Sequence, residues 1–199
     1  LIFIPVLLYV GKRSLIAYDE GFYAIQAKMI LKNNNWIIPT WLNSQTVDRT
    51  IGIQFLIAKS QQIFGQNFFA AHLPTTIAAC LMLFITYKLH QELIDKKEAI
   101  YSSLILASTY IWFNFAHLAT QDMIFASLVT VGLYSLIKLN NEINRLYLVI
   151  FGAWIGLAFM MKTFFVAVPL LALSPKLIYK KAIFKNKFFW IGLIIGFLP

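Results

Sequence analysis

Long apolar runs alternate with short polar segments along this chain. Five runs are candidates for membrane-crossing helices: Phe68–Leu89, Ala99–Phe115, Met123–Ile137, Leu146–Met161 and Phe164–Tyr179. A bilayer core roughly 30 Å thick takes about 20 apolar residues as a helix, so interfacial Tyr and Trp would extend the shorter runs. A sixth run begins near Phe188, and Leu1–Val10 is too short to span. We therefore expect an all-α, polytopic transmembrane helix bundle, truncated at both ends.

The stretch 11–66 is mixed in polarity, and we expect a long outer loop there with two amphipathic helices at the membrane interface. The first helix follows Asp19, and the second covers Ile51–Phe64. Apolar and polar residues recur on opposite sides of each helix at helical spacing. The apolar sides would carry Phe22, Ile25, Met29 and Ile30 in the first helix and Phe55 and Ile63 in the second; the polar sides would carry Gln26, Lys28 and Lys32, then Lys59 and Gln62.

The composition also indicates a membrane protein. The chain is 60% hydrophobic and only 13% charged, whereas soluble domains carry about 25% charged residues. A net charge of +9 would suggest nucleic acid in a soluble protein, but here Lys and Arg stand mainly between the apolar runs. In that position they orient helices across the bilayer, so we expect lipid and no nucleic acid as a partner. Cys80 is the only cysteine, which excludes an internal disulfide.

The basic residues predict the orientation, because short cytoplasmic loops are enriched in Lys and Arg. One set of short loops carries Lys88, Lys96, Lys97, Lys138, Arg145, Lys176, Lys180, Lys181, Lys185 and Lys187, whereas the short loops of the opposite set carry only Lys162. The first set is therefore predicted to be cytoplasmic. Lys12 and Arg13 oppose this orientation mildly, since they follow the first apolar run on its outer side. The candidate site residues all fall outside: Asp19, Glu20, Asp48, Arg49, His117, Asp122 and Lys162.

Two acidic motifs lie in the outer loop. Asp19 would cap the following helix, with Glu20 in its first turn, or a carboxylate there would act as a general base toward a hydroxyl. Asp48 and Arg49 would form a loop ion pair or a cap, or would bind a phosphate or orient a sugar. The fork of an arginine suits phosphate because it donates two parallel hydrogen bonds.

Two further charges stand at the edges of apolar runs. Asp122 would cap the next span, ligate a divalent cation or pair with a basic residue, since a carboxylate at this depth is costly unless paired, coordinated or wet. Lys162 would snorkel to the headgroups or hold a lipid-linked phosphate. His117 lies near Asp122 but is read as an interfacial residue and not as a metal ligand.

Taken in their order along the chain, the motifs around Asp19, Asp48, Asp122 and Lys162 resemble those of a known protein family. The chain is similar to the N-terminal part of a polytopic C-type glycosyltransferase of the dolichyl-phosphate-mannose–protein mannosyltransferase superfamily, whose bacterial branch transfers aminoarabinose to lipid A. The family's Asp-Glu-Ala-Arg-Tyr-Ala resembles Asp19–Ala24, its Gly/Asn-Asp-Trp turn resembles Asn34–Pro39, and its Glu-Lys-Pro-Pro resembles Asp48–Ile51 loosely. Its Asp-Met/Asp-Pro signature and its Gly-Leu-Ala-x-x-x-Lys-Gly resemble Asp122–Met123 and Gly156–Thr163. The chain departs from the family at Phe22, where an arginine is usual, and at Thr50–Ile51, where two prolines are usual.

The resemblance implies one transferase domain over residues 1–199, in a cell membrane, with its active site on the periplasmic or extracytoplasmic side. A sugar would move from a polyprenyl phosphate to a hydroxyl of a protein, lipid A or glycan, with inversion. The implied catalytic residues are Asp19, as base, with Glu20 and Asp48; the implied lipid-phosphate residues are Arg49, Lys162 and Tyr23; Asp122 is a candidate ligand for a divalent metal ion. Two other interpretations stay open, a polytopic transporter and a catalytically inactive homologue.

The orientation can be tested by single-cysteine labelling in intact cells, in a background that lacks Cys80. We predict that a cysteine in the stretch 176–187 is protected from an impermeant reagent, because loops rich in Lys and Arg stay on the cytoplasmic side. A cysteine in the stretch 33–44 should be labelled. Labelling of the 176–187 cysteine would reverse the orientation.

Overall fold

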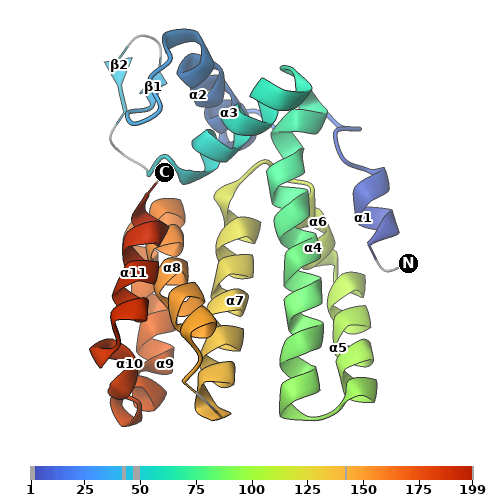
Figure 1. Cartoon of the computed structure of the whole chain (residues 1–199). Helices are drawn as coiled ribbons and strands as arrows, with labels where there is room; N and C mark the ends of the chain where they lie inside the picture. The colour runs from blue at the N-terminus through green and yellow to red at the C-terminus, as the bar shows by residue number, and fades with distance from the viewer. Residues whose placement is uncertain (1–2, 42–43, 47–49, 142, 199) are drawn as a thin grey trace.

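The computed structural model describes residues 3–41, 44–46, 50–141 and 143–198. These residues form a bundle of helices with a layer of shorter helices and one small hairpin across its upper end (Figure 1). The elements are α1 (Ile4–Leu8), α2 (Asp19–Asn33), β1 (Thr40–Trp41), β2 (Ser44–Gln45), α3 (Gly52–Phe64), α4 (Phe68–Leu93), α5 (Lys96–Ser108), α6 (Tyr110–Ala116), α7 (Gln121–Asn141), α8 (Arg145–Lys162), the 3-10 helix η1 (Thr163–Val166), α9 (Ala167–Tyr179), α10 (Ala182–Lys185) and α11 (Lys187–Phe197). The predicted all-α transmembrane bundle is confirmed.

The stretch predicted as the span Ala99–Phe115 is bent instead of straight. Helices α5 and α6 meet at an angle of 69°, and the extended residue Thr109 (φ −74°, ψ 132°) separates them. The Thr109 hydroxyl and backbone N–H both donate to the Leu106 carbonyl, at 2.8 and 3.1 Å. A side chain that donates to a carbonyl of the preceding turn competes with the helical hydrogen bonds, which accounts for the break.

The apolar stretch Arg145–Tyr179 covers 35 helical residues. A straight helix of that length would be about 52 Å long, far more than the thickness of a bilayer core. Thr163, with φ 49° and ψ −122°, interrupts it. The chain then reverses direction. The evidence is a hydrogen bond of 2.7 Å from Lys180, after α9, to the Leu139 carbonyl near the end of α7, which places these two helix ends side by side. The stretch therefore folds back on itself with Lys162 and Thr163 at the turn, and the crossing of the membrane by each of its two arms stays a prediction.

The bundle has two chemically different ends. At its upper end lie the start of α7, the end of α8 and the layer formed by α2, α3 and the hairpin (Figure 1). At its lower end lie the connections that follow α4, α7 and α9 and the helix ends beside them, which together carry most of the basic side chains. Lys138 and Glu92 form an ion pair there between α7 and α4. The cytoplasmic location of the lower end stays a prediction.

The upper layer differs from the sequence prediction in two respects. A hairpin pairs Thr40 with Gln45 and Trp41 with Ser44 in a stretch expected to be loop. The predicted division of α2 into an apolar and a polar side holds only in part: Ile30 is buried and Lys28 is exposed, but Gln26, placed on the polar side, is 1% exposed.

The reason lies in a polar contact between the two helices. The side-chain amides of Gln26 in α2 and Gln54 in α3 hydrogen-bond each other at 2.8 Å, and Gln26 also donates to the Thr46 hydroxyl at 2.9 Å. Because buried amides are tolerated when they are satisfied, the glutamines lie inside with Ala27 and Ile57. The apolar side chains that face outward suit a layer beside lipid headgroups.

Helices α8 and α11 pack at very short range through facing glycines. A Cβ added to Gly152 would lie 2.1 Å from the Phe189 carbonyl oxygen, and one added to Gly192 would lie 2.2 Å from that of Val149. Small residues spaced four apart, such as Gly152 and Gly156, allow this close backbone approach in membrane helices. The pair α8–α11 therefore fixes the orientation of α8 and of Lys162 at its end.

We predict that Gly152→Ala lowers the melting temperature of the full-length protein in detergent. Overpacking of a tight contact typically costs about 1–3 kcal/mol, more than alanine gains as a helix former, up to about 1 kcal/mol. Gly21→Ala is the matched control, since a Cβ at Gly21 in α2 meets nothing closer than 3.7 Å. A Gly152→Ala protein at least as stable as Gly21→Ala would contradict the tight packing.

Candidate functional site

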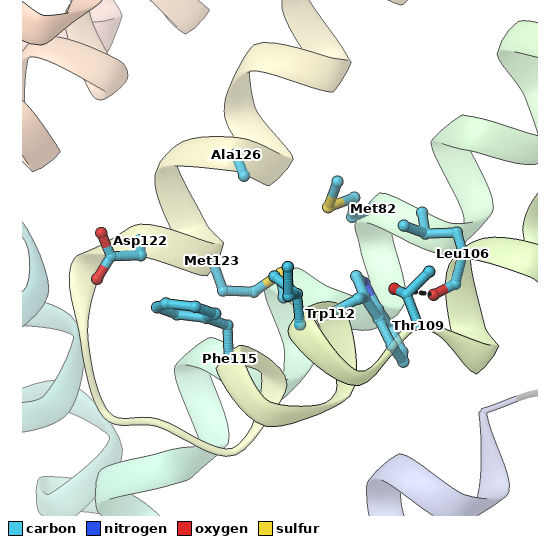
Figure 2. A pocket seen from close by; sticks show the side chains of 9 residues that line it. Met82, Leu106, Thr109, Trp112, Phe115, Asp122, Met123 and Ala126 are labelled. Carbon is cyan, nitrogen blue, oxygen red and sulfur yellow. Dashed lines mark hydrogen bonds between the residues drawn. The ribbon is translucent and has the colours of Figure 1, made fainter.

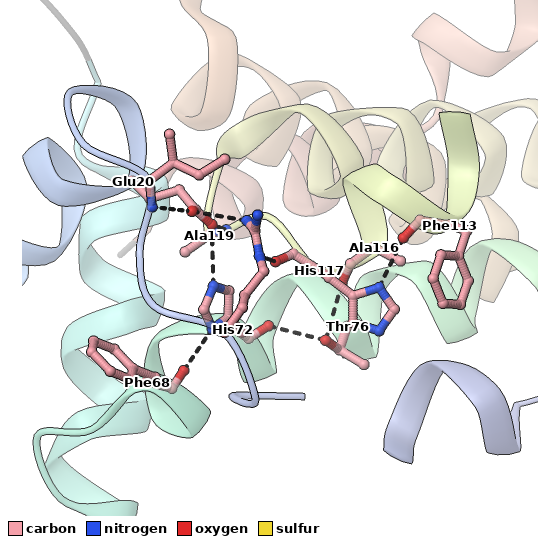
Figure 3. Close-up of polar contacts among 10 residues, drawn as sticks. Glu20, Phe68, His72, Thr76, Phe113, Ala116, His117 and Ala119 are labelled. Carbon is pink, nitrogen blue, oxygen red and sulfur yellow. Dashed lines mark hydrogen bonds and ion pairs between the residues drawn. The ribbon is translucent and has the colours of Figure 1, made fainter. Parts of the chain in front are cut away.

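A buried carboxylate joins the segments at the upper end of the bundle. Glu20, in the first turn of α2, is fully buried and accepts four hydrogen bonds (Figure 3). The donors are Arg13 Nη2 at 2.8 Å, the Ile16 backbone N–H at 2.6 Å, His72 Nε2 at 3.1 Å and the Ala119 backbone N–H at 2.5 Å. Both carboxylate oxygens are thus occupied by donors from three segments: the stretch before α2, helix α4 and the α6–α7 connection. We name this arrangement the Glu20 clamp.

The Glu20 carboxylate is ionised within the clamp. His72 contacts the Phe68 carbonyl through Nδ1 at 2.8 Å and Glu20 through Nε2. The ring is thus held at both nitrogens. Burial raises the pKa of the Glu20 carboxyl, but the hydrogen bonds it accepts, led by that from His72, and the Arg13 charge outweigh burial and hold the pKa below its ordinary value of 4.5. Glu20 is therefore ionised and held between the Arg13 guanidinium and the His72 ring.

Neighbouring hydrogen bonds fix the connection between α6 and α7. The Thr76 hydroxyl donates to the Ala116 carbonyl at 3.0 Å, and Arg13 Nε donates to the His117 carbonyl at 3.2 Å. His117 in turn contacts the Val6 carbonyl through Nε2 at 2.9 Å. These contacts attach the α6–α7 connection to α1 and α4, as Figure 3 shows for the Thr76 contact. Asp122 follows Ala119 by three residues, so its position is set by the same network.

Asp19 stands beside the clamp but faces outward. It is the first residue of α2 and is preceded by Tyr18, which occupies the capping position at φ 80° without a side-chain cap. The cap interpretation of Asp19 was therefore wrong. Its exposed carboxylate lines a pocket of about 470 Å³, whose wall includes Phe22 stacked on Trp41 with ring centroids 4.8 Å apart. Asp19 is thus available to a ligand, whereas Glu20 is not.

Asp122 and Lys162 form an ion pair between α7 and α8. Lys162 Nζ lies 2.5 Å from Asp122 Oδ1, and both side chains are partly exposed. Lys162 lines a pocket of about 460 Å³, together with Thr50, Gln121, Met161, Thr163, Phe164 and Phe165. Thr50 reaches this pocket because α3 begins against the last turn of α8: a Cβ at Gly52 would lie 2.4 Å from the Met160 carbonyl oxygen.

A second, apolar pocket of about 420 Å³ begins at Asp122 (Figure 2). It is lined by Met82, Leu106, Thr109, Ile111, Trp112, Phe115, Met123 and Ala126. The break between α5 and α6 shapes its wall, since Thr109 and Trp112 both line it. The Asp122 carboxylate therefore stands between this apolar pocket and the ammonium of Lys162.

The described residues of this site form no cluster of metal ligands. Divalent cations such as Mg²⁺ and Ca²⁺ take about six or more oxygen ligands. Within the described ranges no group of three or more His, Cys, Asp or Glu side chains converges, and the ammonium of Lys162 already contacts Asp122. Asp122 follows its alternative prediction, a pair with a basic residue.

The remaining predicted residues fall into two groups. Asp48 and Arg49 lie outside the described residues, so the predicted convergence of Arg49 with Lys162 stays a prediction. Tyr23 is only 2% exposed and packs in the core near the contact between α2 and α3, and its contact with a lipid phosphate likewise stays a prediction.

Sequence reasoning missed the partners of Glu20. His72 lies 52 positions away in an apolar helix, and Arg13 was read only as an orientation signal. A polar ring within an apolar run was the available signal for His72, because such a group needs a partner when buried.

The Glu20 clamp predicts a pH-dependent stability. A lowered pKa in the folded state stabilises the protein fully above about pH 4.5, the ordinary value, and this stabilisation is lost as the pH falls through the lowered pKa. Glu20→Gln should cost about 1–3 kcal/mol at pH 7, because buried donors lose a charged partner.

In melting experiments the difference between wild type and Glu20→Gln should narrow below pH 4.5. Glu98→Gln changes an exposed side chain in α5 and should shift stability by less than about 0.5 kcal/mol. Equal stability of all three proteins at pH 7 would show that the clamp does not hold the fold together.

Comparisons with solved structures identify the fold. Crystal structures of ArnT from Cupriavidus metallidurans, bound to undecaprenyl phosphate and in the apo state, match 98% of this chain with TM-scores of 0.85 and 0.87. The chain covers 38% and 40% of those proteins, and the sequence identities are 17% and 18%. This bundle and its upper layer are therefore an ArnT-like fold.

Sequence comparisons agree. The chain is 28% identical to the undecaprenyl phosphate-alpha-4-amino-4-deoxy-L-arabinose arabinosyl transferase of Photorhabdus laumondii, over 90% of this chain and 34% of the relative. It is 27% identical to a second such transferase of Proteus mirabilis, over 86% and 32%. The chain thus spans about a third of the length of these relatives. The family model for dolichyl-phosphate-mannose-protein mannosyltransferase matches residues 48–199, so this membrane-spanning chain belongs to that family.

Proposed function

We propose that this chain is the N-terminal part of a membrane glycosyltransferase that moves a sugar from a polyprenyl-phosphate donor to a hydroxyl acceptor, with inversion at the non-cytoplasmic face. The observation that carries the proposal is the gathering of complementary groups at one end of the bundle. An exposed carboxylate, Asp19, lines one pocket, and a cation, Lys162, lines another. The transferases to which the chain is similar are named for an undecaprenyl-phosphate donor.

The proposed chemistry begins at the acceptor hydroxyl. Its oxygen attacks the anomeric carbon on the face opposite the phosphate, so that a new glycosidic bond forms while the bond to the phosphate oxygen breaks. The proton of the hydroxyl passes to the Asp19 carboxylate, a role that contributes typically 10²–10⁴-fold to the rate. The exposure of Asp19 supports this role. Glu20 is proposed to hold α2 in place without exchanging a proton, since all of its acceptor sites are directed at protein donors.

The departing phosphate gains negative charge that a nearby cation must stabilise. We assign this to Lys162, with Arg49 as its partner. Support for Arg49 comes from the next residue, Thr50, which lines the pocket of Lys162. Asp122 orients the Lys162 ammonium through their ion pair. A divalent metal ion at Asp122 stays a prediction, and the proposed steps are written without one.

The apolar pocket next to Asp122 suits the hydrocarbon chain of the donor. Its lining is formed by membrane-level helices α4, α5, α6 and α7, and burial of each CH₂ there stabilises the bound lipid by about 0.8 kcal/mol. The phosphate would then lie at the level of Lys162 and the prenyl chain would enter the membrane along α5 and α6.

The distribution of charge favours this function over transport. A transporter would be expected to carry paired charges near the bilayer midplane. In α7 and α8, by contrast, the ionic side chains stand at the two ends, with Asp122 and Lys162 at the upper end and Lys138 and Arg145 at the lower end. The outer location of the upper end rests on the basic side chains of the lower one.

We predict that Asp19→Asn folds and inserts normally but loses about 10²-fold or more of the transfer rate, because an amide cannot accept the proton. The assay is transfer from a polyprenyl-phosphate sugar in membranes with the full-length protein, with expression measured in parallel.

The matched control is Asp95→Asn at the lower end, where Asp95 caps α5 by accepting from the Glu98 N–H at 2.8 Å. Asparagine caps as well as aspartate, so this variant should keep wild-type turnover. Near-wild-type transfer by Asp19→Asn would remove Asp19 from the mechanism.

A further inference from the structure

The basic pair Lys12–Arg13 is unexplained by the orientation of the bundle. The pair follows α1 after a short turn and lies at the upper end of the bundle. Lys and Arg are usually enriched on the cytoplasmic side, which is predicted to be the lower end, so cations are disfavoured here. Arg13 is accounted for by its ion pair with Glu20 at 2.8 Å. Lys12 is exposed and, among the described residues, pairs with no acidic side chain; its ammonium lies 5.4 Å from the centre of the Tyr9 ring. Its position therefore calls for an anionic partner from outside the described chain.

Lys12 and Arg13 line a pocket between α1 and α6. The pocket measures about 420 Å³, and its other lining residues are Tyr9, Tyr110, Phe113, Asn114 and His117. No carboxylate belongs to this lining. We name it the Lys12 pocket. It shares no lining residue with the pocket of Lys162, so a ligand in one leaves the other accessible.

The groups around the Lys12 pocket create a positive potential. Arg13 uses Nε and Nη2 for protein acceptors, and Nη1 has no acceptor among the described residues. His117 faces two carbonyl oxygens, of Phe113 through Nδ1 at 2.8 Å and of Val6 through Nε2 at 2.9 Å. Lys12 and Arg13 together favour an anion in the pocket.

The walls indicate that this anion belongs to a lipid. Tyr110 is 79% exposed and Phe113 is 36% exposed, and both lie on α6, the upper part of the bent span. Tyrosine side chains are enriched at the membrane interface, where headgroups lie. An aromatic wall beside Lys and Arg matches a phosphate attached to a hydrocarbon chain.

We propose that the Lys12 pocket binds the phosphate headgroup of an anionic membrane lipid, at a site separate from that of the sugar donor. Lys12 and the free Nη1 of Arg13 donate to the phosphate oxygens, and Tyr110 and Phe113 contact the carbons next to the headgroup. The proposal does not rest on the transfer reaction. Since Arg13 also holds Glu20, the bound phosphate lies one side chain away from the Glu20 clamp.

The test places a photoreactive benzoylphenylalanine at position 110 of the full-length protein in detergent micelles. Phosphatidylglycerol or phosphatidylcholine with the same acyl chains is added, and crosslinked lipid is measured by mass spectrometry. Phosphatidylglycerol should crosslink strongly and the zwitterionic lipid weakly. Lys12→Gln should weaken phosphatidylglycerol crosslinking about tenfold, as expected when one charge-assisted hydrogen bond is lost.

Lys32→Gln is the matched control, because it removes the same charge from an exposed position in α2 at the same end. It should crosslink like the wild type. Equal yields from Lys12→Gln and Lys32→Gln, or equal yields from the two lipids, would overturn the proposal. A structure of the full-length protein with a protein carboxylate on Lys12 would also overturn it. None of these results bears on Asp19 or Lys162, so failure here is distinguishable from failure of the proposed transferase.

Discussion

The burial of one carboxylate, Glu20, is the constraint on which the upper end of this protein depends. An ionised group without water must be surrounded by donors, and here the donors come from the segment before α2, from α4 and from the α6–α7 connection. A buried carboxylate without these donors would destabilise the fold, so the three segments must pack together around Glu20. Asp19, next to Glu20, and Asp122, shortly after Ala119, acquire their positions from it.

The cationic side of the candidate site depends on helix packing instead. The glycine contacts between α8 and α11 fix α8, the turn at Thr163 ends it at the upper end, and Asp122 orients the final side chain, Lys162. Two independent constraints, one electrostatic and one steric, thus bring an exposed carboxylate and a lysine to the same end of the bundle. A separate cationic pocket beside α1 makes use of the clamp's own arginine.

The apolar helices and the clustering of charge at one end were predictable. Both follow from the apolar runs and from the alternation of successive loops between the two sides of the bilayer, and neither depends on tertiary contacts. The break at Thr109 was not, since no proline or glycine marks it. The burial of Gln26 was not predicted, because helical spacing places this glutamine on the polar side of α2, whereas in the structure Gln26 and Gln54 satisfy each other inside. The pairing of Glu20 with His72, across 52 positions, is a long-range contact that one sequence does not reveal.

The central claim is that the upper end holds the phosphate of a polyprenyl donor at Lys162. It is tested most directly by a cryo-EM structure of the full-length protein with undecaprenyl phosphate. The account predicts the phosphate within about 3 Å of Lys162 Nζ, the usual hydrogen-bond distance, in the pocket that includes Thr50, with the prenyl chain beside α5 and α6. A donor phosphate at the lower end, or one seated in the Lys12 pocket with Lys162 still paired only to Asp122, would contradict it.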